Sequence, residues 1–240
     1  MGSKRFKGKV CVYCSERPAV TGDHVFAKEF FLLEDRRDLP QAPTCDACNN
    51  EKSTLEHYLT AVLPFGGRHH QARRNLVNLV PRRLAKNKPL WRQLKFRQTR
   101  STEVIYAVPY ANMALPLNGA KACDLVALIA RGLAWFHWKV HLQPGHISRS
   151  IFISDFGGEF FSKVFELNAA NRVQNTLGNK TVSYAGVQAK DIPQLTVWRV
   201  QLYGGLKVTG DPNAPQQVSS ELAAVTGPER IVHLLTEQSQ

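Results

Sequence analysis

No part of this sequence has the long apolar stretch that a membrane span needs. Its 240 residues contain no run of 18 apolar residues, and transmembrane helices require about that length. The first ten residues, MGSKRFKGKV, carry basic side chains with no apolar segment behind them, so we expect no signal peptide. At 43% hydrophobic residues, an ordinary buried core is expected. We therefore expect a soluble, cytoplasmic protein with no membrane partner.

Acidic residues are scarce as well. The chain has 31 Lys and Arg against 19 Asp and Glu, which gives a net charge of +12 and a pI near 9.7. Such an excess suggests a polyanionic partner, either nucleic acid or an anionic membrane surface. The imbalance is concentrated in residues 68–100, which hold eleven basic residues and no acidic one. Two interpretations stay open for this segment: a solvated basic linker, or a nucleic-acid contact made by Arg68, Arg73, Arg74, Arg82, Arg83, Lys86, Lys88 and Arg92.

Four of the five cysteines form two Cys-x-x-Cys pairs, Cys11 with Cys14 and Cys45 with Cys48. In a reducing compartment such pairs are more often metal ligands than disulfides, and four thiolates make a closed tetrahedral zinc site. The pairs are separated by 30 residues, whereas about 15–20 is usual, so the insert holds something more. Two disulfides or a redox pair are the alternatives, but neither pair opens a βαβ pattern. The fifth, Cys123, is expected to be a small buried hydrophobe.

The pattern of apolar residues predicts an α+β fold. Leucines recur every four residues after the second cysteine pair, which predicts a helix over 49–63. We expect three parts: a zinc-bound module at 1–63, a basic segment at 64–100, and a C-terminal α+β domain with an antiparallel sheet at 101–240. In that domain the pattern predicts helices over 122–140, 158–171 and 229–235, and strands over 103–110, 150–154, 181–187, 195–203 and 206–209.

Between the two cysteine pairs lies the dipeptide Asp23-His24, followed by apolar Val25. The second pair continues as Cys48-Asn49-x-x-Lys52. An Asp-His dipeptide alone is weak evidence, but the combined pattern resembles the HNH, or His-Me finger, endonucleases of the treble-clef type. The resemblance covers about the first quarter of the chain.

This resemblance implies a ββα-metal site, in which a β-hairpin carries Asp23 and His24 and a helix starts at the second cysteine pair. By analogy, Asp23 and Asn49 bind a catalytic Mg²⁺ or Mn²⁺ ion, for which carboxylate and amide oxygens are suitable ligands. His24 is then the general base that takes a proton from the attacking water. Lys52 is either a phosphate contact near the helix start or a solvated helix lysine.

Two features depart from the family pattern or add a condition to it. The middle Asn of the pattern has no counterpart in residues 25–44, and Asp38 and Gln41 are the candidates to replace it. Adjacent residues of a strand point to opposite sides. Asp23 and His24 therefore face one spot only if the strand end is distorted or the phosphate lies between them.

Other histidines, the pairs His69-His70 and His137/His141, are weaker metal candidates, and we favour surface or core roles for them.

Two functions follow from the sequence. The first is a DNA endonuclease that needs a divalent metal, with restriction or phage defence as the favoured setting. Its basic segment would grip phosphates, and residues 101–240 would recognise a target, form a dimer or bind a partner. A homodimer would suit cleavage of both strands, since one such site cuts one strand. The alternative is a non-catalytic, zinc-dependent nucleic-acid-binding or regulatory protein.

Overall fold

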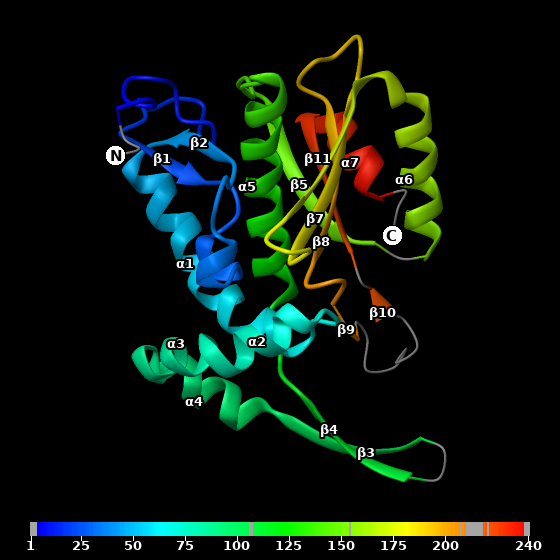
Figure 1. Cartoon of the computed structure of the whole chain (residues 1–240). Coiled ribbons are helices and arrows are strands. Elements are labelled where there is room, and N and C mark those ends of the chain that lie inside the picture. Colours follow the sequence, from blue (N-terminus) through cyan, green and yellow to red (C-terminus); the bar gives the residue numbers. More distant parts are fainter. Residues whose placement is uncertain are drawn as a thin grey trace.

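The N-terminal part consists of a cysteine-bearing loop, a hairpin and a helix. The computed structural model describes residues 4–105, 108–153, 155–206, 208–209, 218–219 and 221–237. Strand β1 (Thr21–His24) pairs antiparallel with β2 (Gln41–Thr44), and the 3-10 turns η1 (Lys28–Phe30) and η2 (Leu33–Asp35) lie in the connection between them. Helix α1 (Asp46–Val62) follows β2 directly, with Cys45 as its N-cap residue. The expected helix is thus confirmed, and it starts three residues earlier, inside the second cysteine pair (Figure 1).

The basic segment is helical, so the interpretation as a solvated linker is wrong. After the 3-10 turn η3 (Leu63–Phe65) come α2 (His70–Asn78), α3 (Val80–Lys86) and α4 (Lys88–Arg97). Proline stands in the first turn of both α3 and α4, where its missing N–H costs no hydrogen bond. Leu84, Leu90 and Leu94 are buried together with Val62 at the end of α1. This small core stabilises the segment despite its charge.

A two-stranded ribbon follows α4. Strand β3 (Thr99–Ile105) pairs antiparallel with β4 (Val108–Ala114), and Figure 1 shows the ribbon projecting from the rest of the molecule. The single strand expected over 103–110 is therefore wrong, because the chain turns back within it. Residues 106 and 107, in the middle of that prediction, lie outside the described residues. Pro109 is tolerated in β4 because both strands of a two-stranded ribbon are edge strands.

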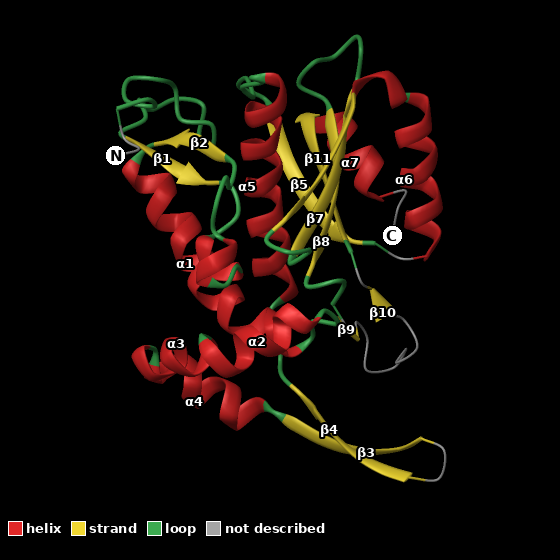
Figure 2. Ribbon diagram, viewed as in Figure 1, coloured by secondary structure: helices red, strands yellow, loops and turns green. Residues whose placement is uncertain are grey.

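The C-terminal part has three layers (Figure 2). Its five-stranded sheet has the order β5-β11-β8-β7-β6, and every neighbouring pair is antiparallel. Helix α5 (Gly119–Trp138) covers one face, and α6 (Asp155–Leu167) and α7 (Glu229–Glu237) cover the other. The strands are β5 (His146–Phe152), β6 (Arg172–Leu177), β7 (Val182–Gln188), β8 (Thr196–Leu202) and β11 (Leu222–Pro228). The 3-10 turn η4 (Ala169–Asn171) precedes β6, and β9 (Val208–Thr209) pairs with β10 (Val218–Ser219).

The three predicted helices and the strands now labelled β5, β7 and β8 are confirmed, with shifted ends; Ser154, at the end of one prediction, lies outside the described residues. The α+β class with an antiparallel sheet is confirmed too. Strands β6 and β11 were missed. β11 is a central strand whose residues from Leu222 to Thr226 are all buried. Its sequence LAAVTGP shows no alternation of apolar and polar residues, because both of its faces are covered by helices.

The N-terminal part and the C-terminal sheet share one hydrophobic core. The Phe6 ring packs edge-on against Trp135 of α5, with ring centroids 5.9 Å apart. Phe26 stacks on Tyr184 of β7 at 5.6 Å. Whether the expected boundaries at residues 63 and 100 separate independently folding units stays a prediction. None of the helices in the described part of the chain combines the length and the apolar character that crossing a bilayer requires.

Gly186 in β7 provides a test of this packing. A Cβ atom at this position would lie 2.3 Å from two atoms of the Trp198 ring, and that ring is fully buried. Gly186→Ala is therefore expected to lower the free energy of unfolding by about 1–3 kcal/mol, the usual cost of overpacking. Urea unfolding followed by circular dichroism measures the change. Gly158→Ala in α6 is the control: its Cβ would meet its nearest neighbour at 3.9 Å, so no comparable loss is expected there.

Candidate metal centre and the Asp23-His24 hairpin

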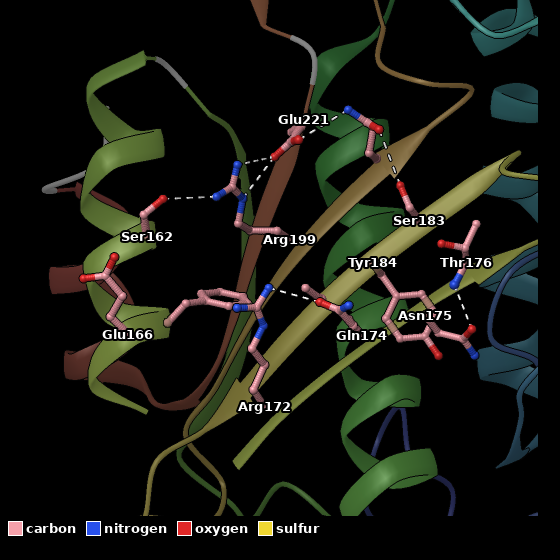
Figure 3. Close-up of a pocket in the computed structure, with 13 residues that line it drawn as sticks. Ser162, Glu166, Arg172, Gln174, Asn175, Thr176, Ser183, Tyr184, Arg199 and Glu221 are labelled. Atoms are coloured by element: carbon pink, nitrogen blue, oxygen red, sulfur yellow. Dashed lines mark hydrogen bonds and ion pairs between the residues drawn. The ribbon is translucent and has the colours of Figure 1, made fainter. Parts of the chain in front are cut away.

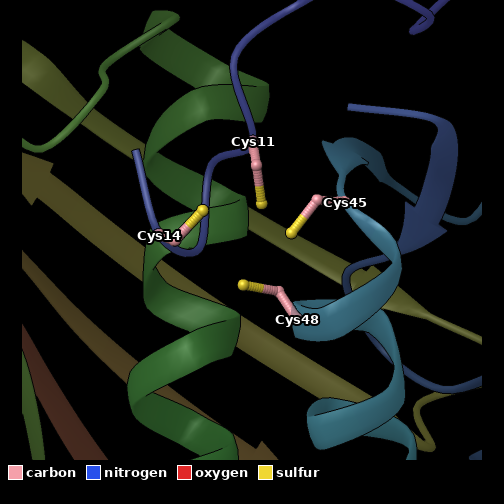
Figure 4. Close-up of side chains that lie close together, drawn as sticks. All are labelled: Cys11, Cys14, Cys45 and Cys48. Carbon is pink, nitrogen blue, oxygen red and sulfur yellow. The ribbon is translucent and has the colours of Figure 1, made fainter. Parts of the chain in front are cut away.

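The four cysteines of the two pairs converge on one point. Their sulfur atoms all lie within 4.8 Å of one another, and none of the chain's cysteines forms a disulfide. Cys11 and Cys14 come from the N-terminal loop, and Cys45 and Cys48 from the start of α1 (Figure 4). Tetrahedral zinc with bonds of about 2.3 Å places its sulfurs about 3.8 Å apart. The cluster is consistent with a structural zinc site, as the sequence predicts.

Hydrogen-bond donors lie beside two of the four sulfur atoms. The backbone N–H of Arg17 donates to Cys14 Sγ, and the Arg17 guanidinium donates to Cys48 Sγ. The nitrogen–sulfur distance is 3.5 Å in both hydrogen bonds. The N-terminus of α1, with its partial positive charge, lies at Cys45. Such outer-shell donors hold ligand side chains in position for a metal. The donor set therefore fits a zinc ion, which two thiolates of the N-terminal loop and two at the start of α1 would hold.

Asp23 lies in a buried network on the α1 side of the hairpin. The Lys52 ammonium is 2.8 Å from Asp23 Oδ2 and also forms a close ion pair with Glu56. It donates to the backbone oxygen of His24 at 2.8 Å as well, and the Tyr13 hydroxyl donates to Asp23 Oδ2 at 2.5 Å. Lys52 has no exposed side-chain surface. The expectation of a solvated lysine is wrong, and a phosphate contact would require Lys52 to leave partners that already take its three N–H donors.

Burial shifts the pKa values of this network. It raises the pKa of Glu56 to about 7, although Lys52 counteracts the shift. It also raises the pKa of Tyr13 well above its usual value, and the nearby Asp23 charge adds to that effect. The pKa of His24 is lowered, first by burial and then by the positive charge of Lys28. A lowered pKa keeps the His24 imidazole neutral, which is the form that can accept a proton.

His24 points to the other side of β1. Its pairing partner across the hairpin is Gln41, and the Gln41 amide nitrogen is 2.8 Å from His24 Nε2. Of the two candidates for the missing Asn, Gln41 is the one that contacts His24; Asp38 is exposed in a turn with a φ of 54°. The strand pairing is regular through His24. Asp23 and His24 therefore leave the strand on opposite sides, as the two-residue period requires.

Asn49 lies in the second turn of α1, one turn before Lys52. Residues three and seven positions apart share one face of a helix, so Asn49, Lys52 and Glu56 lie along the same side of α1. Asn49 is partly exposed. Among the residues that the structure describes, its side-chain amide makes no hydrogen bond. The amide oxygen is therefore available as a ligand on the side of α1 that faces Asp23.

The basic residues of 68–100 differ in what they contact. Arg83 donates to the backbone oxygens of Thr60 and Glu29, and burial lowers its pKa. Arg74 is exposed but paired with Glu34 at 2.6 Å. Arg83 thus ties α3 to the N-terminal part, and its expected contact with nucleic acid stays a prediction. The other expected contacts are exposed: Arg68, Arg73, Arg82, Lys86, Lys88 and Arg92. Their contact with nucleic acid stays a prediction.

A cavity of about 590 Å³ lies in the C-terminal part, between α6 and strands β6, β7 and β8. Figure 3 shows Arg199 held between Glu221 and Ser162 on its wall. The guanidinium of Arg199 donates to Glu221 Oε2 at 2.7 and 3.0 Å and to Ser162 Oγ at 3.3 Å. The lining mixes charges of both signs with amides and hydroxyls, so its chemistry does not define one ligand class.

The sequence interpretation missed Tyr13, Arg17 and Glu56. Glu56 stands four residues after Lys52, a spacing that signals an ion pair on a helix. Tyr13 and Arg17 gave no signal of their own, because their partners come from distant parts of the chain.

Comparison of the chain with models of protein families, with curated protein sequences and with solved structures gives no significant match to any of them.

Proposed function

We propose that this protein is a divalent-metal-dependent DNA endonuclease of the HNH type. One observation carries the proposal: the Asp23-His24 strand is fixed to the helix that begins at the cysteine cluster. Lys52 of α1 contacts both the Asp23 carboxylate and the His24 backbone oxygen. A structural ion at the cysteines would thereby set the position of a second site, formed by the hairpin and the side of α1 that carries Asn49.

In this proposal, Asp23 and Asn49 hold the catalytic ion. The contacts of Asp23 with Tyr13 and Lys52 both fall on Oδ2, which leaves Oδ1 for a cation. When bound, Mg²⁺ or Mn²⁺ would neutralise charge on the scissile phosphate and the leaving oxygen. Because Asp23 and His24 leave β1 on opposite sides, a phosphate that both serve lies at the end of the hairpin, between those sides.

His24 accepts the proton of the attacking water. Rotation of the Gln41 amide by 180° presents its oxygen to the ring. His24 Nε2–H then donates to that oxygen, and Nδ1 carries the lone pair for the proton. Gln41 is in this scheme a positioning residue, which selects the tautomer of His24 without touching the substrate.

The non-catalytic alternative also has an observation in its favour. Lys52 already balances the Asp23 charge in a buried ion pair, and such a pair accounts for Asp23 without any catalytic ion. The protein would then use the cysteine cluster and its basic surface to bind nucleic acid only. Cleavage assays separate the two functions.

His24→Ala is expected to lower the cleavage rate by a factor of about 10²–10⁴, which is the usual contribution of a general base. The substrates are supercoiled plasmid, single-stranded DNA and branched DNA, each with Mg²⁺ or Mn²⁺ added to the zinc-loaded protein. Gel electrophoresis measures cleavage, and fluorescence anisotropy measures binding, which should stay nearly unchanged.

The matched control is His57→Ala, since His57 is an exposed histidine on α1. It should cleave at the wild-type rate. If wild-type protein leaves every substrate intact with both ions, or if His24→Ala cuts as fast as wild type, the nuclease proposal is wrong and the binding function takes its place.

A further inference from the structure

A groove with an apolar floor and a basic edge lies between α3 and α4. It encloses about 880 Å³ and is lined by Phe65, Leu76, Val80, Pro81, Leu84, Ala85, Lys88, Trp91, Arg92 and Lys95. The floor and the α3 wall are aliphatic or aromatic. Every charged residue in the lining is a cation, and all three cations stand on α4.

The α4 wall follows from the sequence of that helix. Lys88, Trp91, Arg92 and Lys95 have the i, i+3, i+4, i+7 spacing of a single helix face. An adjoining face carries Leu90 and Leu94, which are buried in the small core with residues of α1 and α3. Helix α4 is therefore held in place by its leucines, and its tryptophan is not needed for the core.

Trp91 is unlike the other tryptophans. Its exposed fraction is 48%, against 5% for Trp135 and 0% for Trp198, while Trp138 is partly buried against the main core. A large aromatic ring at the edge of an open groove, between basic side chains, is a typical stacking platform for bases of single-stranded nucleic acid. In a duplex the base faces are covered by their neighbours, so such a platform favours unpaired bases.

The charge of the surrounding segment selects an anionic occupant. Residues 68–100 contain no acidic residue. In the described part of the chain, the cations of this segment that contact protein acceptors are Arg74, with Glu34, and Arg83, with backbone oxygens. Lys88, Arg92 and Lys95 are exposed at the groove itself. A ligand with apolar faces and regularly spaced negative charges matches this arrangement.

We propose that the groove binds a single-stranded segment of DNA, with an unpaired base stacked on Trp91 and phosphates against Lys88, Arg92 and Lys95. This inference rests on the proposed function, because it takes DNA as the ligand. It narrows the substrate from DNA in general to DNA with unpaired bases. The protein would act on DNA that has a single-stranded or locally unpaired region, such as a junction, a flap or a displaced strand.

The test is equilibrium binding to fluorescent oligonucleotides without Mg²⁺ or Mn²⁺, so that cleavage does not interfere. The probes are a 20-nucleotide oligo-dT strand, a duplex of the same length, and an amphipathic peptide rich in Asp and Glu. Trp91→Ala is expected to weaken binding of the single strand by about 5- to 150-fold, the range found for loss of one stacked base. Trp91→Phe should retain most of the affinity, because a phenyl ring also stacks.

Two further variants separate stacking from charge. Phe96→Ala removes an aromatic side chain of α4 that is 90% exposed but lies outside the groove lining, and it should bind like wild type. Changing Lys88, Arg92 and Lys95 to Gln should make the salt dependence of binding less steep. The slope of the logarithm of the binding constant against the logarithm of the salt concentration should change by about 0.7 for each phosphate that is no longer neutralised. Trp91→Ala should weaken binding without changing that slope.

Several outcomes overturn the inference. Equal affinity of Trp91→Ala and wild type for the single strand would do so, as would equal binding of the duplex and the single strand. Tighter, Trp91-dependent binding of the acidic peptide would make the groove a protein-docking site, and a Trp91-dependent dimer in sedimentation would make it a self-association site. The cleavage result is independent: binding without cleavage contradicts only the nuclease proposal, and cleavage without Trp91-dependent binding contradicts only this inference.

Discussion

Replacing Cys45 by Ser is expected to release zinc and to unfold the N-terminal part of the chain. Structural zinc contributes about 10–16 kcal/mol in small zinc-binding peptides, whereas a whole domain is stable by about 5–15 kcal/mol. Cys45 is both a member of the cluster and the N-cap residue of α1, which begins at Asp46. Loss of the ion therefore also removes the anchor at the start of the helix. Metal analysis of the purified protein and hydrogen exchange of α1 measure the two effects.

Cys123→Ser is the matched control. Cys123 lies on α5 and contacts the main core only in part, so this variant should keep its zinc and most of its stability. The unfolding midpoint should fall strongly for Cys45→Ser and little for Cys123→Ser. A Cys45→Ser protein with one bound zinc and an unchanged midpoint would contradict a structural four-cysteine site.

Lys52→Met is expected to destabilise the protein by about 3–5 kcal/mol, the usual result of removing one partner from a buried ion pair. Met nearly preserves the volume of the lysine stem, but it leaves Asp23 without its cation on the buried side of the hairpin. It also removes the hydrogen bond to the His24 backbone oxygen. Chemical unfolding measures the loss, and Lys28→Met, at an exposed lysine near the same hairpin, should change stability little.

The loss caused by Lys52→Met should depend on pH. The pKa of Glu56 is raised to about 7 although Lys52 lowers it, so without Lys52 it rises further. When folding raises the pKa of an acid, that acid destabilises the folded state. The destabilisation grows as the pH rises from the pKa of the acid in the unfolded chain to its pKa in the folded protein. The loss is therefore expected to be smaller at pH 6 than at pH 8. A loss of stability that does not change with pH would show that the broken ion pair is not the cause of the loss. The same conclusion would follow if the double variant of Lys52→Met with Asp23→Asn recovered no stability.

Local patterns in the sequence predict local structure well. The spacing of the cysteines predicts a cluster, and the leucines after Cys48 predict a helix that the structure confirms as α1. The apolar spacing in α5 works equally well, because that helix is long and buried along its length. These predictions depend only on residues that are close in sequence.

Features that depend on distant contacts could not be predicted in this way. β11 does not alternate because helices cover both of its faces, and its neighbours β5 and β8 lie far from it in the chain. The burial of Lys52 depends on Asp23, 29 residues before it, and a lysine near a helix start is ordinarily solvated. A solvated linker stayed possible for the basic segment, because only contacts with α1 show that Leu84, Leu90 and Leu94 form a core.

The main core also limits how this chain can be rearranged. Phe6 is covered by Trp135, and Phe26 by Tyr184, so the apolar surface of the cysteine-bearing part is completed by α5 and β7. Transfer of residues 1–63 into another protein would uncover these rings, and a homologous segment brought in by recombination would need matching side chains on both sides. We therefore expect that the cysteine-bearing part does not fold as an independent module and that its sequence changes together with that of the C-terminal sheet.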